Sequence, residues 1–278
     1  MRCPAVILLI IFLCSCERIY YFPDKPLTGT QTVVIAHKGG GFFDDGNTYD
    51  GCMFGLANFE GIEVDLQKGS DNVLWLSHSP YATDCNGSQI CFWLLSKEKI
   101  MEMDSCAGKQ KDFTRLEEIF KYISEHCPGK YISLDVKAWK PCSPYGINIT
   151  REMNLLAQEI IDLTTKYHLE HRVMVESETG DFLYYIKVRT NSIETYQAVF
   201  GDFEMGISRA LHAGFTGVSF EYKFKEEITK EQVELIHRKG LKIQLWTISD
   251  EAVFKEALSL NPDFIQSDIV ISANGQEE

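Results

Sequence analysis

The feature that most constrains the fold of this chain is a repeated alternation of short apolar segments with amphipathic ones. Eight apolar segments of strand length occur at residues 33–37, 61–66, 131–136, 173–177, 195–201, 217–222, 242–248 and 264–268. Between them lie segments with helical spacing of apolar residues, and 150–167 is the clearest. Strands that alternate with helices form a parallel sheet, and eight such units close into a TIM (β/α)8 barrel. An open, doubly wound sheet is the alternative.

The other helical segments fall where a barrel requires them, and one stretch breaks the alternation. Six further helices are predicted at residues 48–59, 114–125, 179–188, 202–213, 229–239 and 250–260. After the second strand, the chain makes a cysteine-containing excursion between His78 and Thr114, with a predicted helix at 94–103. We interpret this excursion as a loop insertion, and partial lid, on the rim formed by the carboxyl ends of the strands.

The first 31 residues are not expected to belong to the barrel. Residues 1–16 have the pattern of a signal peptide, because one Arg precedes an apolar run too short to span a bilayer stably. Leu13-Cys14-Ser15-Cys16 resembles a bacterial lipobox, in which cleavage frees Cys16 for lipidation. We expect export to the bacterial cell envelope, facing the periplasm or the surface, with 17–31 as a tether and 32–278 as a single domain. A plain secretory signal and a short membrane anchor are the alternatives.

Charge and cysteine content limit the possible partners and bonds. The formal net charge of −13 at pH 7 argues against a nucleic-acid-binding surface. Six cysteines follow the predicted signal peptide: Cys52, Cys85, Cys91, Cys106, Cys127 and Cys142. An exported protein can form disulfides, and Cys85 with Cys91 is the favoured pair, although sequence does not define connectivity.

Histidines and carboxylates gather at the ends of the first strands. His37 ends the first strand, Glu63 and Asp65 end the second, and a further short strand leads to His78. Side chains two residues apart on a strand point the same way, so Glu63 and Asp65 are neighbours. Neighbouring carboxylates repel each other unless a cation lies between them, and their oxygens suit Mg²⁺ or Ca²⁺.

Later strands add candidates at the same end, which is the active-site end of a TIM barrel. Asp135 and Lys137 end the third strand, where they either join this site or form a buried ion pair with each other. Trp246, on the seventh strand, is either a core residue or a platform for part of a ligand. Glu176 and Glu221 also end strands, but we do not assign them to the site.

Seven short motifs occur in a fixed order along the chain. They are His37-Lys38-Gly39, Gly46-Asn47-Thr48, Glu63-Val64-Asp65, His78, Asp135-Val136-Lys137, Leu245-Trp246-Thr247 and Ser267-Asp268. In order and spacing, this set resembles the glycerophosphodiester phosphodiesterase family, over nearly the whole chain after the tether. The resemblance implies a TIM barrel of the phospholipase-C-like phosphodiesterase superfamily and the activity of a phosphoric diester hydrolase.

The resemblance also implies a role for each matching residue. Glu63, Asp65 and Asp135 would bind one divalent cation, His37 and His78 would be the catalytic pair, and Lys38, Lys137 and Trp246 would contact the substrate. Three positions depart from the family pattern. Lys38 replaces an Arg and lacks its two-pronged hydrogen bonding to phosphate. Gly46 replaces a Glu, for which Asp44 or Asp45 would substitute, and Asp135 replaces a Glu that reaches one methylene further.

We therefore expect an exported, metal-dependent enzyme that hydrolyses small glycerophosphodiesters to an alcohol and glycerol phosphate. One histidine would activate the attacking oxygen, from water or from a neighbouring substrate hydroxyl, and the other, which we expect to be His78, would protonate the leaving alcohol. A phospholipase of the sphingomyelinase D or phosphatidylinositol phospholipase C type is an alternative. It would require an apolar, membrane-facing loop, for which residues 92–95 are the candidate. A non-catalytic lipoprotein that binds a head group is the third possibility.

Overall fold

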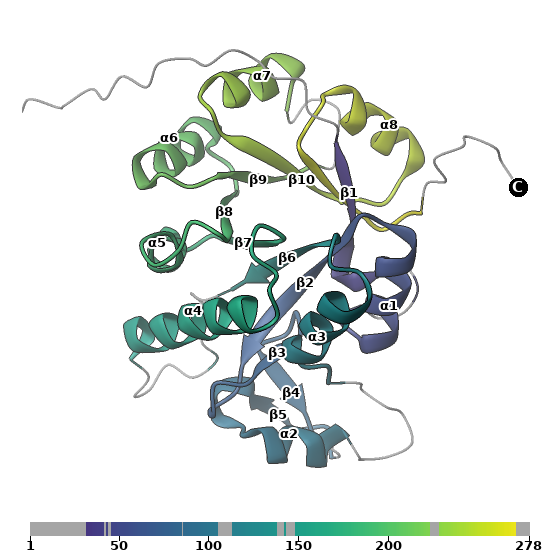
Figure 1. Cartoon of the computed structure of the whole chain (residues 1–278), viewed down its shortest axis with the longest axis vertical. Helices are drawn as coiled ribbons and strands as arrows, with labels where there is room; N and C mark the ends of the chain where they lie inside the picture. The colour runs from purple at the N-terminus through teal and green to yellow at the C-terminus, as the bar shows by residue number, and fades with distance from the viewer. Residues whose placement is uncertain are drawn as a thin grey trace, which may run out of the picture.

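The eight predicted strands form one closed parallel barrel (Figure 1). The computed structural model describes residues 32–41, 43, 46–84, 86–104, 113–137, 142, 148–222 and 228–270. The barrel strands are β1 (Val33–Ala36), β2 (Gly61–Lys68), β6 (Tyr131–Val136), β7 (Val173–Ser177), β8 (Glu194–Val199), β9 (Gly217–Glu221), β10 (Lys242–Ile248) and β11 (Phe264–Ser267). Because β1 pairs in parallel with both β11 and β2, the ring is closed. The TIM barrel prediction is confirmed, and the open sheet is excluded.

Helices surround this barrel, as Figure 1 shows. They are α1 (Tyr49–Asn58), α3 (Leu116–His126), α4 (Ile149–Lys166), α5 (Gly180–Lys187), α6 (Phe203–Ala213), α7 (Lys230–Arg238) and α8 (Glu251–Ser259), each within two residues of its predicted bounds. Oxygens of the residues before α1, α6 and α7 accept hydrogen bonds from their first turns, at Thr48, Asp202 and Thr229. Among the residues described, no helix has the length and apolar character needed to cross a membrane.

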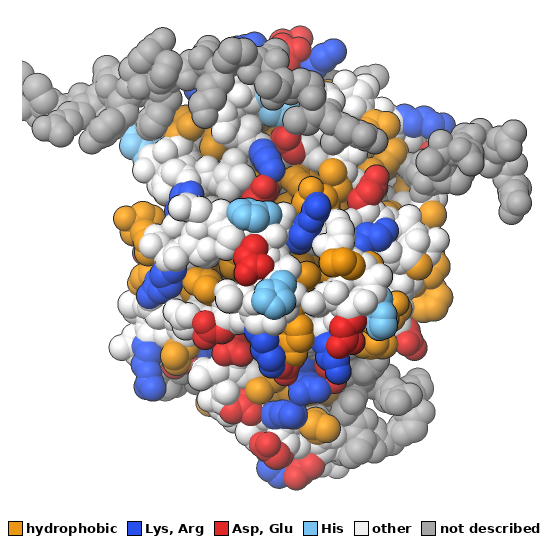
Figure 2. All heavy atoms as spheres, viewed as in Figure 1, with side chains coloured by type: hydrophobic (Ala, Val, Ile, Leu, Met, Phe, Trp, Pro, Cys, Tyr) orange, Lys and Arg blue, Asp and Glu red, His pale blue; other side chains and the backbone are white. Residues whose placement is uncertain are grey.

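The barrel interior is apolar at one end and polar at the other. Ile35, Met174, Tyr196 and Phe264 pack together as a separate buried cluster inside the barrel. Polar residues follow toward the carboxyl ends: Glu176 and Gln266 lie two residues after Met174 and Phe264 on the same strands. On the outer face shown in Figure 2, acidic and basic side chains are interspersed with scattered hydrophobic ones, as on an ordinary solvated surface.

The insertion after β2 has a small core of its own. It comprises β3 (Leu74–Leu76), which pairs antiparallel with β2, a hairpin of β4 (Tyr81–Thr83) and β5 (Gln89–Cys91), the 3-10 turn η2 (Phe92–Leu94), and α2 (Lys97–Asp104). Phe92, Trp93 and Leu95 are buried in that core, and only Leu94 of this stretch is exposed, at 60%. Residues 92–95, the candidate for the membrane-facing loop that the phospholipase alternative requires, therefore do not form one, because three of the four side chains lie in the core of the insertion.

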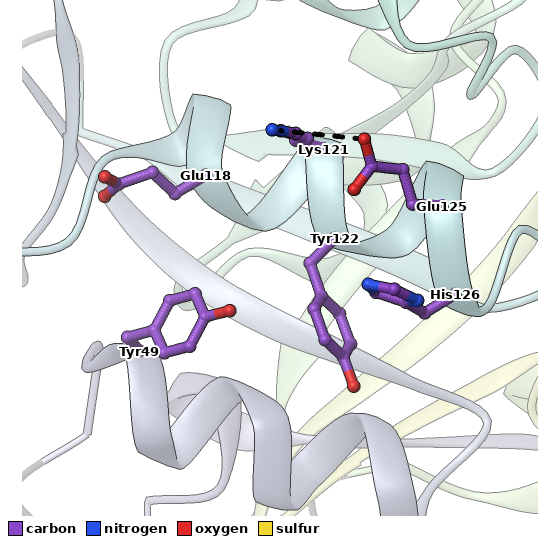
Figure 3. A pocket seen from close by; sticks show the side chains of 6 residues that line it. All are labelled: Tyr49, Glu118, Lys121, Tyr122, Glu125 and His126. Carbon is purple, nitrogen blue, oxygen red and sulfur yellow. Dashed lines mark ion pairs between the residues drawn. The ribbon is translucent and has the colours of Figure 1, made fainter.

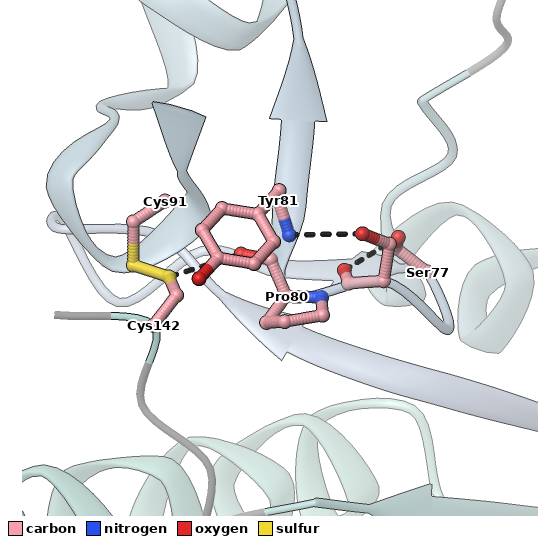
Figure 4. The surroundings of a disulfide bond; sticks show 6 residues. Ser77, Pro80, Tyr81, Cys91 and Cys142 are labelled. Carbon is pink, nitrogen blue, oxygen red and sulfur yellow. Dashed lines mark hydrogen bonds between the residues drawn. A yellow bond between two sulfur atoms is a disulfide. The ribbon is translucent and has the colours of Figure 1, made fainter. Parts of the chain in front are cut away.

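A disulfide fastens the insertion to the segment after β6 (Figure 4). It joins Cys91 to Cys142, whose Cα atoms lie 5.6 Å apart although 51 residues separate them in sequence. The favoured pairing of Cys91 with Cys85 is therefore wrong, and Cys85 itself lies outside the described residues. Short sequence separation misled the prediction, since the β4–β5 hairpin presents Cys91 to a distant segment.

Candidate active site

His37 is held between two carboxylates at the end of β1. It begins the turn η1 (His37–Gly39), and its Nδ1 lies 2.8 Å from Oδ1 of Asp268, just after β11. Its Nε2 lies 4.0 Å from Oε2 of Glu63, which also accepts a hydrogen bond from the backbone N–H of Lys38 (2.8 Å). The Asp268 contact assigns the proton to Nδ1 in the neutral ring, so Nε2 is the nitrogen available for chemistry.

Three carboxylates converge next to His37. Glu63 and Asp65 point inward from β2, and Asp135 lies directly opposite Asp65 on β6. One oxygen from each of the three lies within 4.8 Å of the others. Glu63 and Asp65 are buried, whereas the Asp135 side chain is 30% exposed and faces the barrel mouth. A cluster of carboxylate oxygens is the donor set that Mg²⁺ and Ca²⁺ prefer.

Among the residues that the structure describes, one lysine forms ion pairs with this acidic cluster. Nζ of Lys137 lies 2.5 Å from an oxygen of Asp65 and 2.6 Å from an oxygen of Asp135. The sequence left open whether Asp135 and Lys137 pair with each other or join the site, and in the structure they do both. Burial raises the pKa of Asp65, but the Lys137 charge and hydrogen bond outweigh this and lower it overall. Burial and repulsion by Asp65 and Asp135 raise the pKa of Glu63 well above its usual value, and burial with repulsion by Asp65 and Glu176 raises the pKa of Asp135 to about 8. The cluster therefore has more negative charge than Lys137 can balance, and it fits a cation.

His78 lies near the same cluster, just after the end of β3. The N–H of the preceding residue, Ser77, donates to the carbonyl oxygen of Asp65 (2.9 Å), which holds the end of β3 beside the acids. His78 is exposed at the barrel mouth. Its pKa is lowered by partial burial and by the positive charges of Lys137 and Lys38, against the opposing effect of Asp65. The protonated ring is thus a stronger acid than an ordinary histidine.

Two residues that sequence reasoning did not assign hold the site in place. Asn47 is buried, donates to Oδ2 of Asp65 and accepts from its backbone N–H, both at 2.9 Å. Asp268 orients His37, as described above. Both stand inside motifs that matched the family, Gly46-Asn47-Thr48 and Ser267-Asp268, so the motifs were the available signal.

Gly46, one of the departures from the family pattern, packs closely against Lys38. Gly46 has a φ of +77°, and a Cβ there would lie 2.7 Å from Cβ of Lys38. A Glu at this position would therefore collide with the Lys38 side chain and strain the backbone. Asp44 and Asp45, the suggested substitutes for the missing Glu, lie outside the described residues.

Trp246 lies on the rim, beside aromatic neighbours rather than among the carboxylates. It is opposite Glu221 in the β9–β10 pairing, and its ring centroid is 5.6 Å from that of Phe200. Its Nε1 is buried and has no hydrogen-bond partner among the described residues. A pocket of about 330 Å³ at the ends of β8 and β9 includes Phe200, Phe220 and Glu221. Trp246 is thus a half-buried residue next to this pocket, and its indole N–H is closed to solvent.

A larger hollow lies elsewhere, between α1 and α3 (Figure 3). It has a volume of about 480 Å³ and is lined by Tyr49, Tyr122 and His126 together with charged residues of α3. None of the predicted site residues lines it. Its Lys121 and Glu125 form an ion pair with each other at 4.0 Å. This hollow is not the active site.

Solved structures of similar fold include several phosphodiesterases. A putative glycerophosphoryl diester phosphodiesterase from Silicibacter pomeroyi DSS-3 has a TM-score of 0.71 at 16% identity, with 90% of this chain and 92% of that chain covered. A putative glycerophosphodiester phosphodiesterase from Galdieria sulphuraria gives 0.69 at 23% identity, over 87% and 96%. An Oleispira antarctica phosphodiesterase in complex with the product sn-glycerol-3-phosphate gives 0.71 at 18% identity, over 86% and 94%. At these identities the likeness establishes the fold.

Family membership comes from the sequence itself. No curated protein matches the chain in sequence. The model of the glycerophosphoryl diester phosphodiesterase family, however, matches residues 56–271, well over half of the chain and including all of β2 through β11. The chain therefore belongs to the glycerophosphoryl diester phosphodiesterase family and is a phosphoric diester hydrolase.

Proposed function

We propose that the chain is an exported, metal-dependent enzyme that hydrolyses small glycerophosphodiesters to an alcohol and glycerol phosphate. The observation that carries this proposal is the convergence of Glu63, Asp65 and Asp135 beside the Asp268-backed ring of His37. The product-bound Oleispira antarctica structure, which has the same fold, supports glycerol phosphate as one product.

The residues present fit a hard divalent cation, Mg²⁺ or Ca²⁺. Their donor atoms are all carboxylate oxygens, and in the described part of the chain one lysine ammonium, that of Lys137, pairs with them. Glu63, Asp65 and Asp135 would hold the ion, which when bound neutralises the anionic oxygens of the phosphate. Lys38 and Lys137 would contact the same phosphate as point charges, without the two-pronged geometry of an arginine.

The two histidines supply the proton transfers. We assign His37 as the base, because Asp268 holds its Nδ1 and leaves Nε2 free to accept a proton from the attacking oxygen. That oxygen, from water or from the neighbouring glycerol hydroxyl, forms a bond to phosphorus as the bond to the alcohol oxygen breaks. Attack by the hydroxyl gives a cyclic phosphate, and water then adds to phosphorus and breaks one ring P–O bond to give glycerol phosphate. His78 is the acid that donates a proton to the departing alcohol, since it is exposed where the alcohol leaves. Trp246, on the rim, is the proposed platform for that alcohol.

The test is hydrolysis of a panel of glycerophosphodiesters by chelated protein and by protein reloaded with Mg²⁺ or Ca²⁺, with release of glycerol phosphate measured. We expect turnover only after reloading. His37→Ala and Glu63→Ala should each lower kcat/KM by about a thousandfold or more, the scale typical for groups that act on the reacting atoms. His126→Ala, on the outer helix α3, is the matched control and should retain activity.

Two outcomes would contradict this proposal. Turnover that survives both substitutions would disprove the residue assignment. Absence of turnover on every substrate in every metal condition would favour the non-catalytic head-group-binding alternative. The phospholipase alternative is not favoured, because the apolar stretch it required is buried in the insertion.

Export and lipid anchoring at Cys16 are a separate part of the proposal. The predicted signal peptide and tether, residues 1–31, lie outside the described residues. The Cys91–Cys142 disulfide supports an oxidising compartment, since such bonds are rare in reducing ones. We expect incorporation of a labelled fatty acid in cells that express the full chain and its loss in Cys16→Ser. Equal labelling of the two proteins would disprove the anchor.

A further inference from the structure

A second hollow, of about 580 Å³, lies on the outside of the barrel between α5 and α6. Figure 1 shows these two helices as neighbours. Gly180, Asp181 and Tyr184 of α5, Arg209 of α6, and Gln197 of β8 line it. Its volume is in the range of small-molecule binding sites. No residue of the catalytic cluster contributes to it.

The floor of this hollow contains a buried hydrogen-bond acceptor without a donor. Gln197 is 2% exposed, and its Nε2 donates to the carbonyl oxygens of Ser177 (3.3 Å), Glu178 (3.0 Å) and Ala198 (3.0 Å). Its Oε1 is buried and has no hydrogen-bond partner among the described residues. Reversing the amide would set Oε1 against three carbonyl oxygens, so the observed orientation is fixed. A buried acceptor without a donor is unfavourable, and a ligand N–H that donates to it recovers the lost hydrogen bond.

A glycine lies directly beside this acceptor. Gly180 is the first residue of α5, and a Cβ on it would lie 3.2 Å from Oε1 of Gln197. Its backbone φ is not in the left-handed region, so the conformation does not itself require glycine. Any larger side chain at this position would therefore narrow the hollow at its polar floor.

The walls provide an aromatic surface and one charge of each sign. Phe215 is buried and Tyr184 is half-exposed, so they offer a flat apolar surface. Arg209 extends from α6, where its guanidinium contacts the weak acceptor Sδ of Met205 at 3.2 Å. Asp181 lies in the first turn of α5. By contrast, in the hollow of Figure 3, Glu118 and Lys121 already pair with residues of α3 or its N-cap.

We propose that the α5–α6 hollow binds a small zwitterion that carries a primary ammonium group. The ammonium donates to Oε1 of Gln197 and to Asp181, the anionic group pairs with Arg209, and the apolar remainder packs on Phe215 and Tyr184. An α-amino acid and an ethanolamine phosphate share this chemistry. A quaternary ammonium or an acylated amine does not, because it cannot present the same N–H donors to Gln197.

Calorimetric titration of the full-length protein tests this site with four probes. These are L-phenylalanine with its control N-acetyl-L-phenylalanine, and phosphoethanolamine with its control phosphocholine. We expect at least one primary ammonium probe to bind with a Kd of about 1 mM or tighter, and its matched control to bind at least tenfold more weakly. Tighter binding of L-phenylalanine would indicate an amino acid as the ligand, and tighter binding of phosphoethanolamine would indicate a lipid-derived head group.

Variants locate the binding. Gly180→Val fills the floor, and Arg209→Met, at an exposed helical position, removes the charge while retaining length; each should weaken binding at least tenfold. Gly129→Val is the matched glycine control, since a Cβ there meets nothing within 4 Å, and it should bind as the parent does. If Gly180→Val does not fold, Arg209→Met decides. Failure of both ammonium probes to bind at about 10 mM, or binding that survives Arg209→Met, would overturn the proposal. Neither result depends on hydrolysis at the catalytic cluster.

Discussion

The carboxylate of Glu176 lies next to the catalytic cluster of Glu63, Asp65 and Asp135 inside this barrel, and the two differ in their hydrogen-bond and ion-pair partners. Glu176, on β7, accepts hydrogen bonds from Ser133 (3.3 Å), Ser219 (2.5 Å) and Gln266 (2.5 Å). The catalytic cluster lies one strand away, with Asp135 directly opposite Glu176, and among the described residues Lys137 is the only lysine or arginine that forms an ion pair with it.

The difference shows that burial of an acid does not by itself mark a catalytic group. Burial raises the pKa of Glu176, and hydrogen bonds from Ser219 and Gln266 oppose that rise. Burial also raises the pKa of Glu63, but there the neighbouring Asp65 and Asp135 add to the rise. Glu176 is supplied with neutral donors and is a structural acid, whereas the cluster is balanced only when a cation joins it.

The largest expected effect on activity is the difference between neutralising Glu63, in the cluster, and neutralising Glu176, beside it. Glu63→Gln removes a proposed cation ligand, so kcat/KM should fall about a thousandfold, or about 4 kcal/mol. Glu176→Gln keeps the shape and most of the hydrogen bonds, so kcat/KM should fall less than tenfold. Steady-state kinetics on the same substrate compares them. Equal losses of kcat/KM in the two variants would show that Glu63 and Glu176 do not differ in function.

A smaller effect should follow from loosening the acid that orients His37. Asp268→Asn leaves the size of the side chain unchanged but removes its charge and can invert its hydrogen-bonding role at Nδ1. Partners of this kind typically contribute about 10–100-fold to activity, and we expect a loss in that range in kcat with little change in KM. The cation affinity should stay within about twofold, since Asp268 is not a proposed ligand. A loss confined to KM would contradict a positioning role.

Sequence alone was enough to predict the barrel, all seven described helices that surround it, and the cluster of Glu63, Asp65 and Asp135. These follow from local periodicity and from strand ends that must meet in a parallel barrel. Local periodicity does not predict the disulfide partner of Cys91 or the burial of Phe92. Both depend on how the insertion folds back on the barrel, which is a tertiary contact without local periodicity.

Asn47 and Asp268 were missed for a related reason. Each acts on a partner far along the chain, Asn47 on Asp65 and Asp268 on His37 across 231 residues. An exposed Asn or Asp at a strand end is common, so residue type gave no signal of its own. The two lie within family motifs, which placed them near the site but did not state what they contact.

Removing the cation should make stability depend on pH. The pKa of Asp135 is raised to about 8, so in metal-free protein the folded state holds a proton that the unfolded state releases from about pH 4 upward. Folded protein binds more protons in this window, and the free energy of unfolding should therefore fall as pH rises from about 5.5 to 8. Because the Asp135 side chain is 30% exposed, solvent screening limits the expected loss to about 1–2 kcal/mol.

Urea denaturation in the presence of a chelator measures this loss at both pH values. Residue 135 cannot titrate in the Asp135→Asn variant, so the free energy of unfolding of this variant should change less between pH 5.5 and pH 8. The change that remains in the variant comes from other titrating groups and serves as the control. Metal-free parent protein that is equally stable at pH 8 and pH 5.5 would contradict the account of uncompensated charge in the cluster.

The smallest expected effect tests the one ligand position that departs from the family. Asp135→Glu adds one methylene, so the carboxylate reaches further toward Glu63 and Asp65 and narrows the space they enclose. Mg²⁺ requires shorter ligand distances than Ca²⁺, about 2.0–2.1 Å against 2.3–2.6 Å, so a narrower site should favour Mg²⁺. We expect the ratio of the Kd for Ca²⁺ to the Kd for Mg²⁺ to rise about three- to tenfold in calorimetric titrations. Glu176→Asp, outside the cluster, should leave that ratio unchanged. If both variants shift it equally, Asp135 does not differ from Glu176 in its relation to the cation.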